Sequence, residues 1–371
     1  MGNHLVNLVW CDLNSDRYLQ AGGDCFSVQR ASGLPLANAA LRAGAGRRPA
    51  LPGKVRRVPG ERSSAFCMTH YTRRQPRVKL GGMQTTFRMQ GIAALLTMAA
   101  ACASAQNDPN RKDWIQAFNG RNLDGWVMKI TGFPVGENYA NTFRVENGLL
   151  KAAYDQYPEF GGHFGHLFYK TKFSHYIVAA EYRFVGEQAK GGPSWALRNN
   201  GIMIHCQAAE TMGKDQDFPI SVEVQLLGGA PTGERSTANM CSPGTEVFHD
   251  GQMVKSHCLN SKSPTLRGEQ WVRVEAEVLG NERVRTFVNG EQVLEFGNLQ
   301  IGGGNVTNFD PAVKKDGTPL GEGYIALQGE SAPTEFRKVE ILNLSGCMDP
   351  KASNYKSYFV HRDDKACVYA K

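Results

Sequence analysis

Alternating apolar and polar positions dominate the second half of the chain. In residues 221–227, three aliphatic side chains alternate with Glu223 and Gln225. Because successive side chains of a strand point to opposite faces of a sheet, this pattern predicts a strand with one apolar and one polar face. Alternation, or runs of β-branched and aromatic residues, predicts further strands over residues 143–152, 176–184, 201–207, 271–278, 283–296, 323–328 and 336–342.

Turn signals separate these strands. Asn147-Gly148 and Asn289-Gly290 each lie between two strand-like runs, and both pairs predict hairpins. The chain has 371 residues and 41 glycines without low-complexity segments, and we find no internal repeat and no long amphipathic pattern. The sequence therefore predicts an all-β fold in which two antiparallel sheets pack as a sandwich.

One apolar stretch is of a different kind. Residues 91–101 form an apolar run of eleven residues behind a short segment that contains Arg88. This run is too short to cross a bilayer and has the length of the apolar core of a signal peptide. The small residues at 103–105 predict cleavage before Gln106, and hence an exported, periplasmic or secreted protein. Lipoprotein anchoring through Cys102 is the less favoured alternative, because three alanines precede it.

The net charge changes sign along the chain. The formal charge is +7, but residues 1–82 hold 13 Lys/Arg against 4 Asp/Glu, whereas the chain from Gln106 onward has a net charge of −3. Residues 1–82 are interpreted either as an over-extended gene model, with initiation at Met83 or Met89, or as a disordered basic leader. No basic stripe with interleaved aromatics follows, so we predict no nucleic-acid partner.

Five cysteines follow the predicted signal peptide. An exported chain enters an oxidising compartment, where cysteines pair. Pairing each cysteine with its neighbour in sequence predicts the disulfides Cys241–Cys258 and Cys347–Cys367. Cys206 is left over in an apolar strand, where a buried, inert thiol is favoured over a nucleophile. No cysteine or histidine spacing predicts zinc.

The alternating pattern ends near residue 345. We therefore divide the mature chain into a sandwich over residues 106–345 and a tail over 346–371, which one disulfide closes. Asp349, Asp363 and Asp364 in the tail are interpreted as solvated acids, with calcium binding as the alternative.

Several predicted strands carry polar side chains opposite their apolar face. On strict alternation these faces hold Glu181 with Arg183; Met203 with His205 and Gln207; Glu223 with Gln225; and Tyr324 with Gln328. A solvated outer sheet face explains any one of them. A concave face that binds a polyhydroxylated ligand explains the whole set, because planar carboxylates and carboxamides form paired hydrogen bonds to neighbouring hydroxyls. Trp195, Tyr182 and Tyr324 are candidates for stacking on a sugar ring.

An ordered set of motifs carries a family resemblance. The set comprises Phe118-Asn-Gly at the start of a segment ending in Gly125-Trp126, Phe143-Arg-Val, Asn199-Asn-Gly-Ile202, Val222-Glu-Val-Gln225, Gly323-Tyr-Ile-Ala-Leu-Gln328 and Phe336-Arg337. In this order the motifs resemble the 3-keto-disaccharide hydrolase domain family over residues 114–344. Asn200 replaces the usual Ser and Val222 the usual Tyr. The tail resembles a short module appended to secreted bacterial proteins.

The resemblance implies a concanavalin-like, laminin-G-like jelly-roll sandwich that acts on glycosides already oxidised to a ketone at C3. Such a ketone acidifies the C2 hydrogen, so a general base removes it, the aglycone leaves from C1, and water adds back. The expected activity is that of a hydrolase or lyase for 3-keto-glycosides or 3-keto-disaccharides. A non-catalytic carbohydrate-binding sandwich is the alternative, and a scaffold domain is the third interpretation.

At positions that match the family's motifs, the resemblance implies roles for individual residues. Glu223 or His205 would transfer the proton, although many relatives carry Arg at the position of His205. The implied substrate-binding residues are Gln225, Gln328, Asn199, Glu181 and Arg337. Arg337 is equally interpreted as a structural partner of a buried acid. A divalent metal acting on the enediolate is an alternative for which the spacing supplies no ligand set. No other cofactor is predicted, because the chain has no dinucleotide fingerprint.

Overall fold

The computed structural model describes residues 9–13, 16–21, 24–27 and 110–370. The chain divides into two compact units, residues 1–78 and 79–371. In the first unit, β1 (Val9–Leu13), β2 (Asp16–Ala21) and β3 (Asp24–Ser27) form an antiparallel sheet. The predicted signal peptide, its cleavage before Gln106 and the anchoring alternative at Cys102 lie outside the described residues. These predictions, and both interpretations of residues 1–82, stay predictions.

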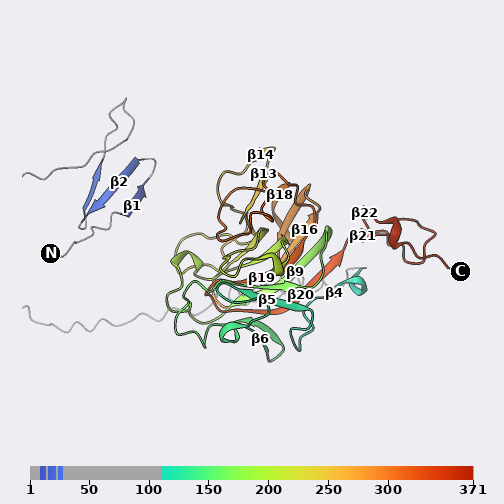
Figure 1. The fold of residues 1–371 in the computed structure, drawn as a ribbon, viewed down its shortest axis with the longest axis horizontal. Coiled ribbons are helices and arrows are strands. Elements are labelled where there is room, and N and C mark those ends of the chain that lie inside the picture. Colours follow the sequence, from blue (N-terminus) through green and yellow to red (C-terminus); the bar gives the residue numbers. More distant parts are fainter. Residues whose placement is uncertain (1–8, 14–15, 22–23, 28–109, 371) are drawn as a thin grey trace, which may run out of the picture. The chain divides into compact units, whose positions relative to one another are not determined.

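Two large sheets make up the second unit (Figure 1). The seven-stranded sheet has the order β15-β12-β11-β10-β19-β8-β5, and all of its pairings are antiparallel. Its strands are β5 (Trp126–Ile130), β8 (Gly165–Tyr169), β10 (Asn199–Cys206), β11 (Val222–Leu227), β12 (Asn239–Cys241), β15 (Cys258–Leu259) and β19 (Tyr324–Gly329).

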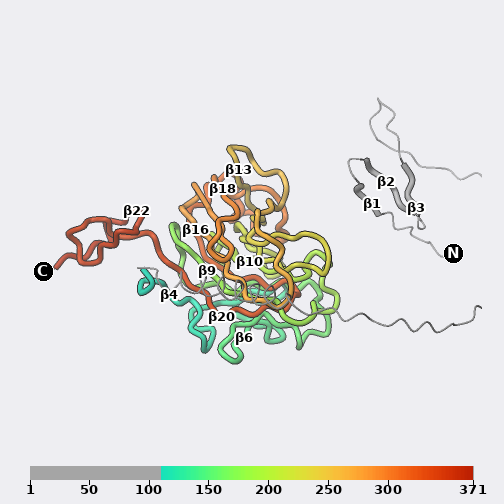
Figure 2. Tube along the Cα trace, turned by 180° about the vertical axis from the view of Figure 1, so that it is seen from behind, coloured from blue at the N-terminus to red at the C-terminus, as the bar shows by residue number. Residues whose placement is uncertain are grey.

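The ten-stranded sheet has the order β14-β13-β18-β17-β16-β9-β20-β7-β6, with β4 added to β20. Figure 2 shows β16, β9 and β20 side by side, as their pairing requires. Its strands are β4 (Ile115–Gln116), β6 (Phe143–Glu146), β7 (Leu149–Ala152), β9 (His175–Phe184), β13 (Thr245–His249), β14 (Gln252–Met253), β16 (Val272–Leu279), β17 (Arg283–Val288), β18 (Glu291–Ile301) and β20 (Thr334–Asn343).

Helices are short in the described part of the chain. They are the 3-10 turns η1 (Arg111–Asp113), η2 (Tyr139–Asn141), η3 (Ser194–Ala196), η4 (Ala209–Thr211) and η5 (Asp364–Ala366). None of the helices described is long and apolar enough to span a membrane.

The main apolar core fills the space between the two sheets. Val222 and Val224 of β11 are fully buried there, as are Val178 of β9 and Val274 of β16. The neighbouring residues of each strand point to the opposite face, as the alternation predicts. The predicted fold class is therefore confirmed: the protein is an all-β, two-sheet antiparallel sandwich of the concanavalin-like, jelly-roll type.

A β-bulge in β10 interrupts this alternation. The register between β10 and β19 shifts between Met203 and Cys206, and His205 has a left-handed backbone with φ of 52°. A bulge adds one residue to a strand and reverses the face of those beyond it. The expectation that Met203 and His205 share a face is therefore wrong, because His205 turns into the core between the sheets.

Both predicted disulfides are present. Cys241 of β12 is bonded to Cys258 of β15, and Cys347 to Cys367, with S–S distances of 2.06 and 1.96 Å. Cys206 is a free, buried thiol whose pKa is raised by burial, which agrees with an inert side chain. Disulfides persist in oxidising compartments, so the two bonds agree with an exported protein.

The tail after the sandwich contacts it through an ion pair and a stacked pair of rings. β21 (Ser345–Gly346) pairs in parallel with β22 (His361–Arg362), and Lys356 Nζ lies 2.9 Å from the carboxylate of Asp113. The ring of His361 stacks on that of His175 at 4.3 Å. The tail acids have protein partners: Asp349 accepts from Tyr369, Asp363 from the Lys365 amide, and Asp364 from Arg362.

Candidate functional site

A row of polar residues crosses the outer face of the seven-stranded sheet. The row runs across β12, β11, β10, β19, β8 and β5. Its residues are paired across neighbouring strands: Asn239 with Gln225, Gln225 with Gly201, Gln328 with His166, and His166 with Lys129. Gly201 lies opposite Gln328, because the adjacent Ile202 pairs with Leu327. Their neighbours in each strand point into the core, so the row lies on the outer face.

Gly201 makes room in this row for the side chain of Glu223. A Cβ atom at Gly201 would lie 2.7 Å from Cγ and 2.8 Å from Oε1 of Glu223. The carboxyl group therefore folds across β10 onto the one position of the row without a side chain. The carboxyl group therefore lies between Gln225 on β11 and Gln328 on β19.

A second buried acid lies beside Glu223. Glu330 follows the end of β19 and continues its register opposite Asn199 of β10, and its pKa responds to the charge of Glu223. Glu223 is 5% exposed and Glu330 2%. Burial raises the pKa of Glu223 to about 8. Burial raises the pKa of Glu330 well above its usual range, and the Glu223 charge raises it further, against the opposing charge of Arg235. Burial and the interaction with Glu223 therefore both favour the protonated form of Glu330.

Unpartnered polar atoms gather on this face. Among the described residues, eleven buried side-chain nitrogen and oxygen atoms make no hydrogen bond, and seven of them lie on His166, Asn199, Glu223, Gln328 and Glu330. Each such atom costs about 1–3 kcal/mol of stability. A fold tolerates this cost where the groups serve a ligand, so this cluster is the candidate functional site.

His166 lies at the end of the row, next to Lys129. Its ring is fully buried, and burial together with the nearby charge of Lys129 lowers its pKa to about 3. The neutral imidazole offers one N–H donor and one acceptor. Lys129 Nζ donates to the carbonyls of Lys214 and Ile130, at 2.8 and 3.0 Å, and so ties the segment after β10 to the sheet.

An aromatic wall extends from His166 to the surface. The ring of Phe218 lies 5.8 Å from that of His166 and 4.9 Å from that of Phe164. Phe164 stacks on Trp195 at 5.9 Å, and Trp195 is 53% exposed. An exposed indole beside buried polar groups suits the apolar face of a sugar ring. The same expectation for Tyr182 is wrong: it is buried in the core and bonded to Leu227 O and the Thr237 hydroxyl. Tyr324 packs against a separate apolar cluster that includes Met203.

The structure thus brings together Glu223, Gln225, Gln328 and Asn199, and it separates the other predicted site residues from them. His205 Nε2 lies 3.0 Å from Gly280 O, and its ring packs edge-on against Tyr176. Burial lowers its pKa to about 4. His205 therefore contacts the ten-stranded sheet and does not face Glu223.

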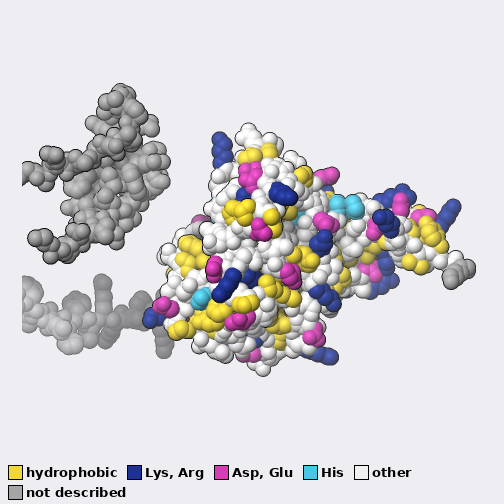
Figure 3. Space-filling model, in the orientation of Figure 1, with side chains coloured by type: hydrophobic (Ala, Val, Ile, Leu, Met, Phe, Trp, Pro, Cys, Tyr) yellow, Lys and Arg dark blue, Asp and Glu magenta, His cyan; other side chains and the backbone are white. Residues whose placement is uncertain are grey.

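Glu181 and Arg337 lie on the outer face of the ten-stranded sheet. Arg337 Nε is 2.6 Å from Glu181, and Arg273 lies 3.4 Å from the same carboxylate. Arg337 and Arg183 flank the ring of Trp271, at 4.8 and 4.7 Å from its centroid. The structural interpretation of Arg337, as the partner of a half-buried acid, fits this arrangement. Charges of both signs are likewise interspersed over the surface shown in Figure 3.

His166 and Glu330 were not among the residues predicted from the sequence. The strand Gly165–Tyr169 carries its own alternation, with His166 and Phe168 opposite Leu167 and Tyr169, and this signal would have placed His166 on the polar face. Glu330 follows the strand that ends in Gln328-Gly329, where an acid resembles an ordinary loop residue.

A metal does not fit the described residues. Their one group of three potential ligands within reach of a common ion is Cys241, His257 and Cys258, and its two sulfurs are bonded to each other. A disulfide sulfur is no longer the thiolate that binds metal. Glu223, Glu330 and His166 form no such group, so we route no chemistry through a metal.

Comparison with known proteins assigns the family. The sequence model of the 3-keto-alpha-glucoside-1,2-lyase-like domain matches residues 113–342, well over half of the chain. The chain belongs to this family. The match includes both sheets and the whole candidate site of the lyase-like domain, and the tail lies beyond it.

Solved structures give weaker likenesses. A candidate glycosyl hydrolase from Parabacteroides distasonis is 16% identical, covers 62% of this chain and 99% of its own, and has a TM-score of 0.38. The carbohydrate-binding module CBM66 from Bacillus subtilis is 9% identical, covers 62% of this chain and 96% of its own, and has a TM-score of 0.31. No curated protein matches the chain. The family assignment therefore rests on the family model alone.

Proposed function

We propose that this lyase-like domain cleaves the glycosidic bond of 3-keto-glycosides or 3-keto-disaccharides by elimination and hydration. The observation that carries the proposal is the pair of buried, adjacent carboxyl groups of Glu223 and Glu330 among unpartnered polar side chains. The family name supports a substrate with a ketone at C3. The two disulfides support an exported protein that meets this substrate outside the cytoplasm.

Glu223 is the general base in this proposal. A ketone at C3 makes the C2 hydrogen acidic, and the ionised carboxylate removes it as C1–O breaks and C1=C2 forms. A base is most effective when its pKa lies near the working pH, and burial raises that of Glu223 to about 8. His205, the other predicted proton-transfer group, is given no role in this proposal because it faces the core.

Glu330 is the acid of the pair. Burial and the neighbouring Glu223 charge raise its pKa well above the usual range, so in this proposal it carries a proton and donates it to the leaving oxygen of the aglycone. Water then adds its hydroxyl to C1, Glu223 returns its proton to C2, and Glu330 recovers a proton from the water. The net reaction is hydrolysis, and both carboxyl groups end as they began.

The remaining groups of the row bind the sugar. Gln225 and Gln328 offer carboxamides to neighbouring hydroxyls, and Asn199 extends the row toward Glu330. The neutral ring of His166 donates to or accepts from a further hydroxyl or the C3 carbonyl. Trp195 supplies the stacking surface at the mouth.

The test is release of the aglycone from 3-keto-trehalose and from a 3-keto-glucoside, together with exchange of the C2 hydrogen in D2O. Wild type should catalyse both, Glu223→Gln should lose both, and Glu330→Gln should retain exchange but lose release. Glu291→Gln, at an exposed acid of β18, is the matched control. Tight sugar binding without release or exchange would refute catalysis and favour the carbohydrate-binding alternative.

A further inference from the structure

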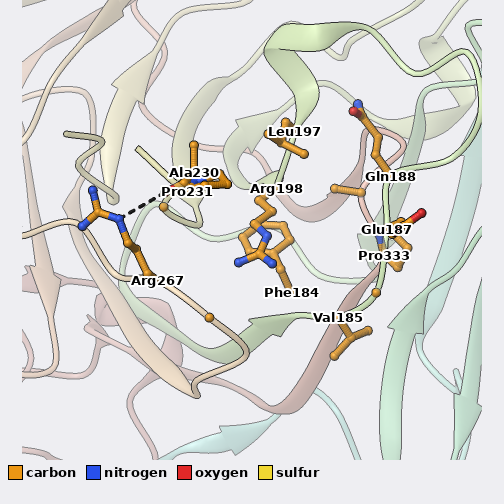
Figure 4. Close-up of a pocket in the computed structure, with 14 residues that line it drawn as sticks. Phe184, Val185, Glu187, Gln188, Leu197, Arg198, Ala230, Pro231, Arg267 and Pro333 are labelled. Carbon is orange, nitrogen blue, oxygen red and sulfur yellow. Dashed lines mark hydrogen bonds between the residues drawn. The ribbon is translucent and has the colours of Figure 1, made fainter. Parts of the chain in front are cut away.

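A cavity lies at the end of the sandwich where β9 ends and β10 begins (Figure 4). Its volume is about 420 Å³, within the size range of small-molecule sites. Apolar walls come from Phe184, Leu197, Pro231 and Pro333. The dimensions and the lining suit a ligand of monosaccharide size.

Arg198 supplies an unused charge in this cavity. Figure 4 shows its side chain among the lining residues, next to Phe184. Within the described residues, its guanidinium forms no hydrogen bond and no ion pair, and Glu187 in the same lining is not paired with it. Arg267 is the second cation of the lining, and its hydrogen bonds go to the neutral carbonyls of Ala230 and Gly233. Among the residues that the structure describes, no acid is paired with either arginine of the cavity.

Two consecutive glycines allow the arginines to take these positions. A Cβ atom at Gly228 would lie 3.1 Å from Cβ and 3.2 Å from Cδ of Arg198, and 2.8 Å from the Phe184 ring. A Cβ atom at Gly229 would lie 2.6 Å from Cγ of Arg267. Both arginine stems thus pack where only glycine leaves space.

The backbone of Arg198 is also held in place. Its φ of 45° is in the left-handed region, which costs about 1–3 kcal/mol in a residue with a side chain. The buried part of Arg235 stabilises this turn by donating to the carbonyls of Leu197, Arg198 and Gly228. The surroundings therefore fix the position of Arg198, and the N–H groups of its guanidinium remain available to a ligand.

The cavity adjoins the candidate site through two neighbouring strands. Arg198 directly precedes Asn199 on β10, and Pro333 follows Glu330 by three residues beyond β19. The exposed side chains of Trp195 and Leu197 lie on the segment between the site and the cavity. This adjacency in sequence is the reason for assigning the next sugar unit of a bound substrate to the cavity.

We propose that this cavity binds a sugar unit that carries a carboxylate, through Arg198. A planar guanidinium forms two parallel, charge-assisted hydrogen bonds with a carboxylate, and the apolar walls face the ring. That this unit is the leaving group of the substrate rests on the proposed function. The binding itself does not, and is measured without any reaction.

The test is calorimetric titration of the whole chain with D-glucuronate, D-glucose and acetate. Glucuronate should bind at least tenfold more tightly than either, since glucose lacks the charge and acetate lacks the ring. Arg198→Gln should weaken glucuronate binding by about tenfold to a hundredfold and leave glucose binding unchanged. Arg121→Gln, at an exposed arginine outside the cavity lining, should change neither.

Three outcomes would overturn the proposal: glucuronate binding no tighter than glucose, glucuronate binding no tighter than acetate, or glucuronate binding unaffected by Arg198→Gln. Arg198→Met, which keeps the stem against Gly228, serves as a second variant if Arg198→Gln unfolds. The titrations are repeated with Glu223→Gln. Unchanged glucuronate affinity there separates this site from the catalytic proposal, whichever way the activity test ends.

Discussion

Gly201→Ala is the most direct test of how the candidate site is built. The new Cβ would lie 2.7 Å from Cγ, 2.8 Å from Oε1 and 3.0 Å from Cδ of Glu223. Carbon atoms in contact normally lie about 3.5–4.0 Å apart, so the Glu223 side chain must move by roughly 1 Å. A misplacement of that size in a reacting group costs about a hundredfold in rate. We therefore expect kcat/KM for a 3-keto-glycoside to fall about a hundredfold.

The effect of this substitution on stability should be small by comparison. Alanine in a strand is about 0.5–1 kcal/mol more favourable than glycine, while overpacking costs about 1–3 kcal/mol. The two terms partly cancel, so the free energy of unfolding should fall by no more than about 2.5 kcal/mol. A loss of activity much larger than the loss of stability therefore reports on the position of the carboxyl group.

The matched control is Gly304→Ala. A Cβ atom there meets nothing within 4 Å, and the backbone is not left-handed, so both activity and stability should be unchanged. The double variant Gly201→Ala/Glu223→Gln should be no slower than Glu223→Gln alone, because both changes act on one group. Full activity of a folded Gly201→Ala variant would refute the reasoning, since Glu223 would then not need its place over Gly201.

Four further predictions follow from buried groups and one disulfide. Because burial raises the pKa of Glu223 to about 8, kcat/KM should rise about tenfold per pH unit from pH 6 and level near pH 8; a flat profile would contradict its role as base. Because the folded state raises the pKa of Glu223, protonation of this group stabilises the fold fully below about pH 4.5, and this stabilisation is lost as the pH rises through about 8. In urea titrations, the free energy of unfolding of Glu223→Gln should therefore depend less on pH over that window. Gln328→Leu removes two unpartnered buried atoms and should raise the free energy of unfolding by about 1–3 kcal/mol while weakening sugar binding; a destabilised variant would mean that Gln328 has partners in solution. Cys241→Ala/Cys258→Ala opens a bridge between residues 17 apart and should cost about 3 kcal/mol in guanidinium unfolding; an unchanged midpoint would show that the bond constrains little.

The alternation of side chains was enough to predict a two-sheet antiparallel sandwich and three residues of the site. It depends on one local rule, that neighbours in a strand face opposite ways, and the rule held along β11, along β19 and along β10 as far as Met203. It placed Glu223, Gln225 and Gln328 on polar strand faces because no bulge separates them from the core residues used as reference. Asn199 was predicted from the family resemblance. Because the geometry of a strand is regular, the local sequence is enough to predict which face of the sheet each of its side chains occupies.

The rule failed where a property that is not local decided the outcome. His205 changes face because of a bulge that the sequence around it does not reveal. Glu181 and Arg337 belong to polar faces, as expected, but alternation does not say to which sheet a strand belongs. The raised pKa of Glu330 depends on burial and on a neighbour that is remote in sequence.

The two polar sheet faces differ in one physical property that the sequence does not contain. On the ten-stranded sheet, Glu181 and Arg337 form an ion pair, so these polar groups are partners of each other. On the seven-stranded sheet, Glu223 and Gln328 are buried without partners, and the fold bears that cost. The first kind of face needs no further partner, whereas the second gains stability from a ligand that supplies the missing hydrogen bonds. The candidate site therefore differs from an ordinary surface less in polarity than in the number of its buried polar groups that lack a hydrogen-bond partner.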